Sequence, residues 1–399
     1  MSTNQESTPP TAPLRLASID AYRGLAMFLM MGEVLSFRAV SRRLPDNPIW
    51  KFLCDHQSHV EWVGCSLHDM IQPSFSFLVG VALPFSLAGR LARGNSKTRV
   101  VAHALWRSLI LVFLGVFLRS RHGSQTHFTF EDTLSQIGLG YPWLFLLALC
   151  SVRVQLSALA VVLIGYWGAF AVYPAPGPAF DFAAVGVGAD WPHPTGFAAH
   201  WDKNSNLAWA FDVWFLNLFP RESVFKYNGG GYSTLSFIPT LGTMIMGLLA
   251  GGVLKSPRPA WSKIGLLVVA GGLAIALGWG LGALGVCPVV KRIWTPSWTL
   301  YSGGICLIAL AVFYLILDLA GVRFWAFPLR VIGMNSIAAY CMAGLFESFI
   351  GHNLTIHLGK APFQILGGPY EPLLHGAGVL LVLWLILFWM YRNKIFLRV

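Results

Sequence analysis

The sequence has little charge. Only 11% of its 399 residues are Asp, Glu, Lys or Arg, whereas 55% are hydrophobic and the mean hydropathy is +0.61. A soluble domain carries about 25% charged residues, so this composition excludes a water-soluble fold. The apolar residues form long runs, such as 105–118, 264–286 and 376–390. Runs of about 17–25 apolar residues match the hydrocarbon thickness of a bilayer, and most of these runs have no polar face.

Cysteine is scarce, and its spacing forms no motif. The six cysteines include no Cys-x-x-Cys pair, and His56 and His59 have no further partner at metal-ligand spacing, so we expect no metal. Cys54 and Cys65 fall in one predicted loop. A disulfide between them is possible, but the sequence does not decide it because nothing fixes their separation. The net charge of +11 does not indicate a nucleic-acid partner here, because basic residues flank apolar segments as they do in membrane proteins.

The apolar runs predict one all-α integral membrane domain at residues 16–399, a bundle of about ten transmembrane helices. Residues 1–15 are polar and Pro-rich, which predicts a disordered cytoplasmic tail rather than a cleaved signal. The predicted spans lie near residues 21–40, 69–89, 100–118, 132–150, 154–173, 233–254, 262–284, 298–317, 329–350 and 373–391.

An even number of spans places both termini on one side of the membrane. Lys and Arg are more frequent in the loops on that side, which predicts that both termini are cytoplasmic. The long loops 41–68 and 174–232 are then extracytoplasmic. The second is rich in Trp, Asp and Asn; such a loop suits sugar rings, and an interfacial aromatic belt is the alternative.

The stretch that carries the strongest chemical signal is residues 56–73, with three His, a Glu and an Asp just before an apolar run. A His whose pKa is near neutral suits general-base catalysis, and Asp69 or Glu61 could orient it. Two further carboxylates, Glu33 and Glu347, fall inside predicted spans, where ionisable groups are functional hypotheses by default. Glu33 is near the outer end of its span and is expected to reach the same cavity as the His cluster.

The pattern His59-x2-Trp62-x-Gly64-x4-Asp69-x3-Pro73 resembles the signature of the heparan-α-glucosaminide N-acetyltransferase family of transmembrane acyltransferases. Four further segments resemble that family in the same order along the chain: Ser18–Gly24, Pro239–Gly251, Gly333–Ser336 and Tyr391–Phe396. The resemblance covers nearly the whole chain. It resembles a shorter, bacterial-type member without the luminal domain of the lysosomal proteins, which implies the bacterial inner membrane.

The resemblance implies transfer of an acetyl or longer acyl group from cytoplasmic acetyl-CoA to an amino sugar or sugar hydroxyl of an extracytoplasmic glycan. The family's catalytic His falls on His59, acting as general base or transient acyl carrier. Glu33 stands where lysosomal members carry an Asn. Asn335 is a candidate oxyanion donor, with helix–helix hydrogen bonding as its alternative. Four residues near His59 are predicted to contact the acceptor: Trp62, Glu61, His56 and His68. Basic residues of the cytoplasmic loops are predicted to bind the CoA phosphates: Arg90, Arg93, Lys97, Arg99, Lys255, Arg258 and Lys263.

Two alternative functions are also compatible with the sequence. A transporter or flippase of a sugar or lipid-linked substrate would use the same helices without acyl chemistry. A structural or sensory membrane protein would use the long loop as a partner-binding surface and would bind no CoA. The sequence also leaves a homodimer open.

Overall fold

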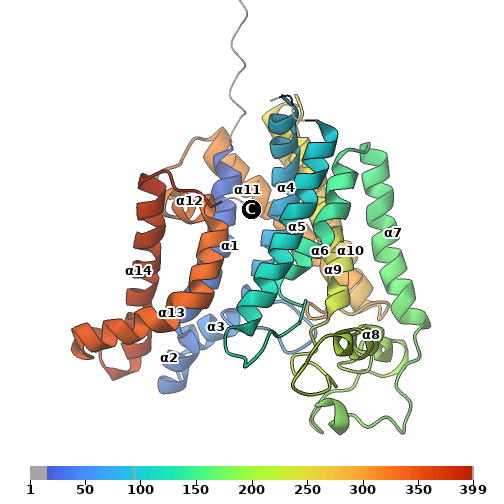
Figure 1. Ribbon diagram of the computed structural model, residues 1–399, viewed down its shortest axis with the longest axis horizontal. Helices are drawn as coiled ribbons and strands as arrows, with labels where there is room; N and C mark the ends of the chain where they lie inside the picture. The colour runs from blue at the N-terminus through green and yellow to red at the C-terminus, as the bar shows by residue number, and fades with distance from the viewer. Residues whose placement is uncertain (1–15, 93, 95, 398–399) are drawn as a thin grey trace, which may run out of the picture.

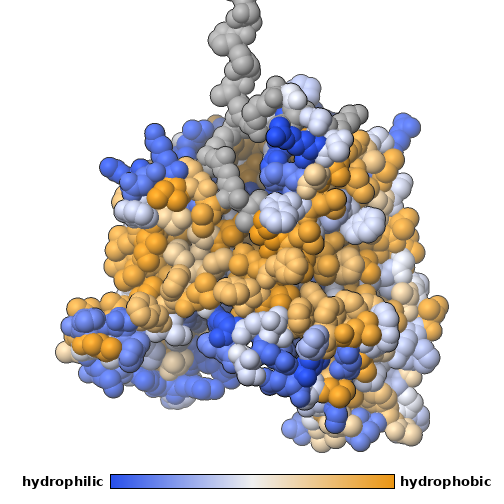
Figure 2. Space-filling view, in the orientation of Figure 1, coloured by the Kyte–Doolittle hydropathy of each residue, from blue (hydrophilic) through white to orange (hydrophobic). Residues whose placement is uncertain are grey.

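The computed structural model describes residues 16–92, 94 and 96–397, and within these ranges the chain folds into helices without a β-sheet. The helices pack side by side into one bundle (Figure 1). A band of hydrophobic residues crosses the middle of the molecule, with polar residues gathered above and below it (Figure 2). The predicted fold class, an all-α integral membrane bundle, is confirmed. The predicted tail at residues 1–15 lies outside the described residues.

A helix lies at each of the ten predicted spans. These helices are α1 (Ala17–Met31), α4 (Ile71–Ala92), α5 (Lys97–Ser120), α6 (Thr133–Ala148), α7 (Val152–Val172), α9 (Phe237–Lys255), α10 (Ala260–Ala283), α11 (Pro296–Phe313), α12 (Phe327–Met334) with α13 (Ser336–Leu358), and α14 (Glu371–Arg392). Three shorter helices belong to the loops: α2 (Phe37–Arg43), α3 (Pro48–His56) and α8 (Leu207–Phe215).

Within the described ranges, eight segments are long and apolar enough to cross a membrane, and α12 with α13 counts as a ninth if the pair is one span. The span predicted near 329–350 is therefore not one straight helix, because α12 and α13 meet at 83° on either side of Asn335. The Asn335 amide donates to the Ile395 carbonyl (2.9 Å) and accepts from the Leu397 N–H (3.1 Å), so the segment Ile395–Leu397 is held at the break. The remaining predicted span, near 132–150, is α6, which is only 16 residues long.

The start of α1 and the C-terminal end of the described chain lie on one face of the bundle, the inner face (Figure 1). The opposite, outer face carries α2, α3, α8 and the loops 41–68 and 174–232 (Figure 1). The first turn of α1 is fixed by Asp318, whose carboxylate accepts from the N–H groups of Ala17 (2.9 Å) and Ser18 (3.1 Å). A negative charge at a helix N-terminus also interacts favourably with the helix dipole.

The outer loop 174–232 is folded rather than extended over the surface. Trp201 is fully buried and stacks on Phe170 of α7, while Trp62 of the other outer loop donates its indole N–H to the Trp201 carbonyl (3.1 Å). Trp62 and Trp201 are therefore core residues that join the two outer loops. Trp191 and Trp209 are partly exposed, and Trp214 is 61% exposed.

Two helix crossings bring backbones into close contact through glycine. A Cβ atom at Gly247 of α9 would overlap the carbonyl of Phe77 in α4, and one at Gly333 of α12 would overlap the carbonyl of Asp20 in α1. Small residues at such crossings allow helices to pack closely in a bilayer. Two of the segments that resemble the acyltransferase family, Ser18–Gly24 and Gly333–Ser336, thus pack against each other.

We expect Gly247→Val to destabilise the fold by about 1–3 kcal/mol, the usual cost of overpacking a core, because the new side chain forces α9 away from α4. Thermal unfolding in detergent, followed by tryptophan fluorescence, measures the change. Gly252→Val is the matched control, since Gly252 is exposed on the same helix and has nothing near its Cβ position. Equal melting temperatures for the two variants would contradict the tight α4–α9 crossing.

Candidate active site

The imidazole of His59 and the carboxylate of Asp69 form a hydrogen-bonded pair at the outer end of α4. His59 Nδ1 lies 2.8 Å from Asp69 Oδ1. Asp69 is 1% exposed, and its Oδ2 accepts from the backbone N–H groups of Val60 (3.2 Å) and Ser66 (3.1 Å) and from the Ser66 hydroxyl (3.0 Å). The loop before α4 therefore folds around this carboxylate. The predicted orientation of His59 by Asp69 agrees with this geometry, and Glu61 is exposed instead.

A buried lysine completes this pair. Lys291, in the loop between α10 and α11, is 5% exposed; its ammonium lies 3.3 Å from Asp69 Oδ1 and 3.1 Å from His59 Nδ1. An ammonium and a protonated nitrogen can only donate, and an ionised carboxylate can only accept. Because the shortest contact of His59 Nδ1 is with the Asp69 carboxylate, we assign the hydrogen to Nδ1. The Lys291 ammonium then donates to Asp69, its contact with Nδ1 is not a hydrogen bond, and Nε2 keeps a free lone pair. We call His59, Asp69 and Lys291 the outer triad.

The surroundings of His59 keep it neutral at physiological pH. Although 37% of its side chain is exposed, the protein atoms on its other sides remove hydration and lower its pKa from 6.5. The charges of Lys291 and His68 lower this pKa further, while the hydrogen bond to Asp69 acts in the opposite direction. Burial also lowers the pKa of Lys291, and the attraction of Asp69 opposes this effect. A neutral imidazole with a free Nε2 can accept a proton.

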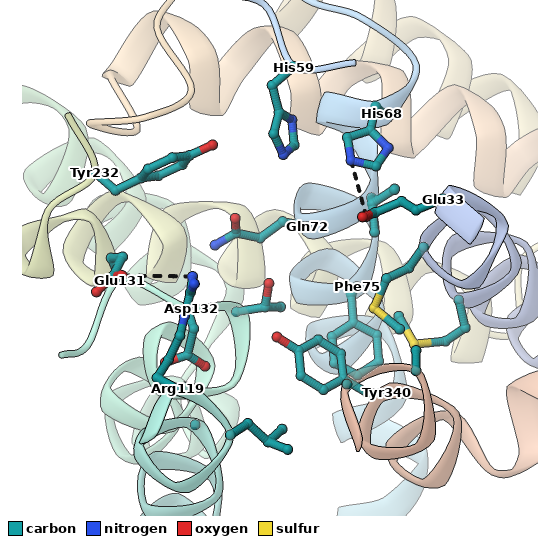
Figure 3. A pocket seen from close by; sticks show the side chains of 18 of the residues that line it. Glu33, His59, His68, Gln72, Phe75, Arg119, Glu131, Asp132, Tyr232 and Tyr340 are labelled. Atoms are coloured by element: carbon teal, nitrogen blue, oxygen red, sulfur yellow. Dashed lines mark ion pairs between the residues drawn. The ribbon is translucent and has the colours of Figure 1, made fainter. Parts of the chain in front are cut away.

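His59 and Lys291 of the outer triad line a cavity of about 670 Å³, which we call the outer cavity. His59, His68 and Glu33 lie at one end of it, and Arg119 and Glu131 lie across it (Figure 3). Glu33 Oε1 is 3.2 Å from His68 Nε2, and the rings of His68 and His59 are 4.4 Å apart. The structure thus brings Glu33, in the 3₁₀ turn Gly32–Leu35 that follows α1, to the His cluster, as expected from the sequence.

The far wall of the outer cavity contains acidic groups that the sequence did not single out. Arg119 pairs with Glu131 at 3.7 Å, and Asp132 caps α6 by accepting from the N–H groups of Leu134 (3.0 Å) and Ser135 (3.1 Å). Burial raises the pKa of the Glu131 carboxyl, although the charge of Arg119 opposes this. Glu347, which the sequence predicts to be an intramembrane carboxylate, also lines this cavity.

A second cavity of about 310 Å³, the inner cavity, opens between helices toward the inner face. Its lining includes the guanidinium groups of Arg23, Arg90 and Arg107, each on a different helix. Arg107 donates to the Tyr141 hydroxyl (3.2 Å) and stacks over its ring at 4.7 Å, and Arg90 lies 3.2 Å from His103 Nε2. Three arginines around one cavity form a site suited to phosphate groups.

Several predicted site residues lie away from these cavities. Trp62 is in the core described above, and His56 Nδ1 accepts from the Leu67 N–H (3.3 Å) without lining the outer cavity. The amide of Asn335 is bonded to the C-terminal segment, so the structure does not bring it to His59 as an oxyanion donor; its alternative role in joining segments agrees with the geometry.

The predicted phosphate-binding residues largely stay at the surface. Arg90 alone among those described lines the inner cavity. The ammonium groups of Lys255 and Lys263 donate to the carbonyls of Pro84 (3.2 Å) and Leu254 (2.8 Å), and Arg99 and Arg258 are exposed. Arg93 lies outside the described residues, as does the side chain of Lys97.

Cys54 and Cys65 are separate thiols, and the described residues contain no cluster of three or more His, Cys, Asp or Glu that could hold a metal ion.

The fold and the site define a polytopic helical membrane protein with a basic cavity toward one face and a carboxylate–imidazole pair toward the other. The chain is similar to the heparan-alpha-glucosaminide N-acetyltransferases of human and mouse. It is 25% identical to the human protein over a 427-residue alignment that covers 97% of this chain, and 23% identical to the mouse protein over 387 residues, or 86% of this chain.

These alignments confirm the resemblance to the heparan-α-glucosaminide N-acetyltransferases. The alignments cover 60% of the human and 56% of the mouse protein, so the chain spans less than two thirds of the curated relatives it matches. No family model matches the chain.

Proposed function

We propose that residues 16–399 form one transmembrane acyltransferase domain that moves an acetyl group from acetyl-CoA at the inner face to an amino sugar or sugar hydroxyl at the outer face. The inner face is then cytoplasmic, as in the inner membrane of a bacterium. The outer triad carries this proposal, because it presents a neutral, oriented base to a cavity large enough for a sugar. The names of the curated relatives support the same reaction class.

The inner cavity is the proposed donor site. Arg23, Arg90 and Arg107 would hold the phosphates of acetyl-CoA, since guanidinium groups bind phosphate oxygens through paired hydrogen bonds. The acyl-pantetheine arm then extends toward the outer cavity and brings the thioester carbonyl to His59.

His59 acts as general base in the proposed reaction. The acceptor nitrogen or oxygen attacks the thioester carbonyl and forms a new bond to carbon, while its proton moves to His59 Nε2. The carbon–sulfur bond then breaks and CoA leaves as the thiolate, which recovers a proton from the imidazolium or from water. Asp69 holds the tautomer and stabilises the imidazolium, and Lys291 balances the buried carboxylate.

Two side chains of the outer cavity are candidates for the oxyanion role that Asn335 does not fill. The Tyr232 hydroxyl and the Gln72 amide both lie in the cavity between His59 and the far wall (Figure 3). Burial raises the pKa of Tyr232, so its hydroxyl stays protonated and can donate a hydrogen bond.

The carboxylates of Glu33, Glu131, Asp132 and Glu347 in the same cavity favour an acceptor that carries an amine.

The direct test uses the purified protein, radiolabelled acetyl-CoA and a panel of amino sugars and neutral sugars. We expect label on an amino sugar and release of free CoA. A transporter or flippase would move its substrate and consume no acetyl-CoA. Absence of both CoA binding and label transfer would refute the acyltransferase.

We expect Arg107→Gln to weaken acetyl-CoA binding by on the order of 10-fold or more, because a hydrogen bond to a charged group contributes about 1.5–3 kcal/mol. Isothermal titration calorimetry on the detergent-solubilised protein measures the dissociation constant. Arg258→Gln is the matched control, since Arg258 is exposed on the inner face and does not line the inner cavity. If both variants bind as the wild type does, the donor site lies elsewhere.

The pH profile of acyl transfer tests the role of Lys291. Protonation of His59 removes the base, so the rate should fall on the acid side, and the lowered pKa places this fall below pH 6.5. Lys291→Met removes a charge that lowers this pKa, so the acid limb should move to higher pH. Rates of both proteins at saturating acceptor over a series of pH values measure the shift. An unchanged limb would show that Lys291 does not act on the titrating group.

A further inference from the structure

One face of α4 lines both cavities. In the outer cavity this face presents Gln72 and Phe75, just after His68 in the preceding 3₁₀ turn. In the inner cavity it presents Phe75, Val79, Ala82, Leu83, Ser86 and Arg90. The steps between these residues are mostly three or four, which keeps them on one side of an α-helix. The helix therefore provides a continuous wall that leads from the proposed donor site to the His cluster.

Phe75 is the point where the two cavities meet. Among the described residues that line them, Phe75 alone lines both. Its side chain is 5% exposed and packs in the core cluster that includes Met27 and Tyr141. Figure 3 shows Phe75 at the end of the outer cavity away from His59, beyond Gln72. The ring therefore closes the floor of the outer cavity and one end of the inner cavity.

We infer that Phe75 is a movable partition between the two cavities, which the acyl-pantetheine arm displaces to reach His59. The inference rests on the proposed acyl transfer. A donor held by its phosphates at Arg90 and Arg107 brings its thioester to the outer triad only by passing Phe75. A phenylalanine ring makes no hydrogen bond, so its rotation breaks only packing contacts. Met27 and Met30 line the adjacent part of the outer cavity, and flexible thioether side chains repack easily around a displaced group.

The proposed partition also keeps the two cavities apart. When no donor is bound, the ring separates the polar outer cavity from the arginines of the inner cavity. Donor binding then replaces the ring with the pantetheine arm, and the passage stays filled. The size of residue 75 should therefore control both the passage of the donor and the leak of small solutes.

The first experiment compares Phe75→Trp with the wild type in acetyl-CoA binding and in acyl transfer. We expect Phe75→Trp to lower kcat by on the order of 10²-fold, because displacing the reacting groups by even 1 Å can cost that much, while the arginines of the inner cavity still hold the phosphates of acetyl-CoA. Phe75→Leu should keep kcat close to that of the wild type, since its smaller side chain leaves the passage clear. Phe85→Trp is the matched control, because Phe85 lies on the same helix, is half-buried and lines neither cavity. Equal kcat in Phe75→Trp and Phe85→Trp would overturn the inference.

The second experiment does not depend on acyl chemistry. Phe75→Ala and Phe85→Ala are reconstituted into proteoliposomes loaded with a pH-sensitive dye, and proton leak is followed after an external pH step without acetyl-CoA. We expect leak only through Phe75→Ala, and acetyl-CoA should suppress it. If the wild type neither binds nor consumes acetyl-CoA, the proposed function fails, whereas a leak specific to Phe75→Ala still supports the partition. Equal leak in both variants would refute the partition even if the wild type is an active acyltransferase.

Discussion

We expect His59→Gln to reduce acyl transfer by on the order of 10²–10⁴-fold, the usual contribution of a general base, while acetyl-CoA still binds. The effect is large because His59 Nε2 is the free lone pair of the outer triad, and glutamine offers no group that takes a proton near neutral pH. The affinity should persist because the inner cavity lies beyond Phe75. Single-turnover transfer from labelled acetyl-CoA, measured together with the dissociation constant, separates the two effects.

His56→Gln is the control for this experiment. His56 belongs to the same loop and the same residue type, but it does not line the outer cavity. It should keep most of the wild-type rate. A comparable loss in both variants would indicate that the loop needs its histidines for folding, and an active His59→Gln protein would exclude His59 as the base.

The second large effect is expected for Asp69→Asn. The amide can donate to His59 Nδ1 and so favour the tautomer that lacks a free Nε2, which should reduce transfer about as much as loss of the base itself. The substitution also leaves Lys291 buried without a carboxylate. Breaking a buried ion pair by removing one partner costs about 3–5 kcal/mol, so this variant should also unfold at a lower temperature.

The double variant Asp69→Asn with Lys291→Met separates the two consequences. It removes both buried charges, and replacing a whole buried pair by uncharged groups is often close to neutral for stability. We therefore expect the melting temperature to recover and the activity to stay low. Recovery of both would show that Asp69 only balances Lys291, and recovery of neither would show that the carboxylate holds the loop through Val60 and Ser66.

The fold could be predicted from the sequence because its main determinant is local. Each long apolar run is a helix, since the bilayer requires every backbone polar group to be satisfied within its own segment. The break at Asn335 could not be predicted, because it depends on hydrogen bonds to Ile395 and Leu397, sixty residues further along the chain. The inward packing of Trp62 and Trp201 likewise depends on contacts between two distant loops.

The candidate site shows the same limit. His59 and Asp69 lie in one stretch, and the sequence suggested their pairing. Lys291 lies far along the chain; the only sequence signal was a Lys-Arg pair in a short outer-face loop, where the positive-inside rule disfavours basic residues. Arg107 carries a stronger signal, because an Arg within an apolar span is a functional hypothesis in itself. A search for basic residues in the loops alone does not find it.

The continuity of α4 has a consequence for the length of the donor. From Gln72, beside the outer triad, to Arg90 in the inner cavity, the helix rises about 27 Å at 1.5 Å per residue. α4 is a single helix over this length, with Pro84 inside it, so this face sets the separation between the phosphate site and the base. A thioester carried on a short thiol could not occupy both ends at once. The protein would thus select its donor by reach as well as by chemistry, and it would favour the acyl group that arrives on a long carrier.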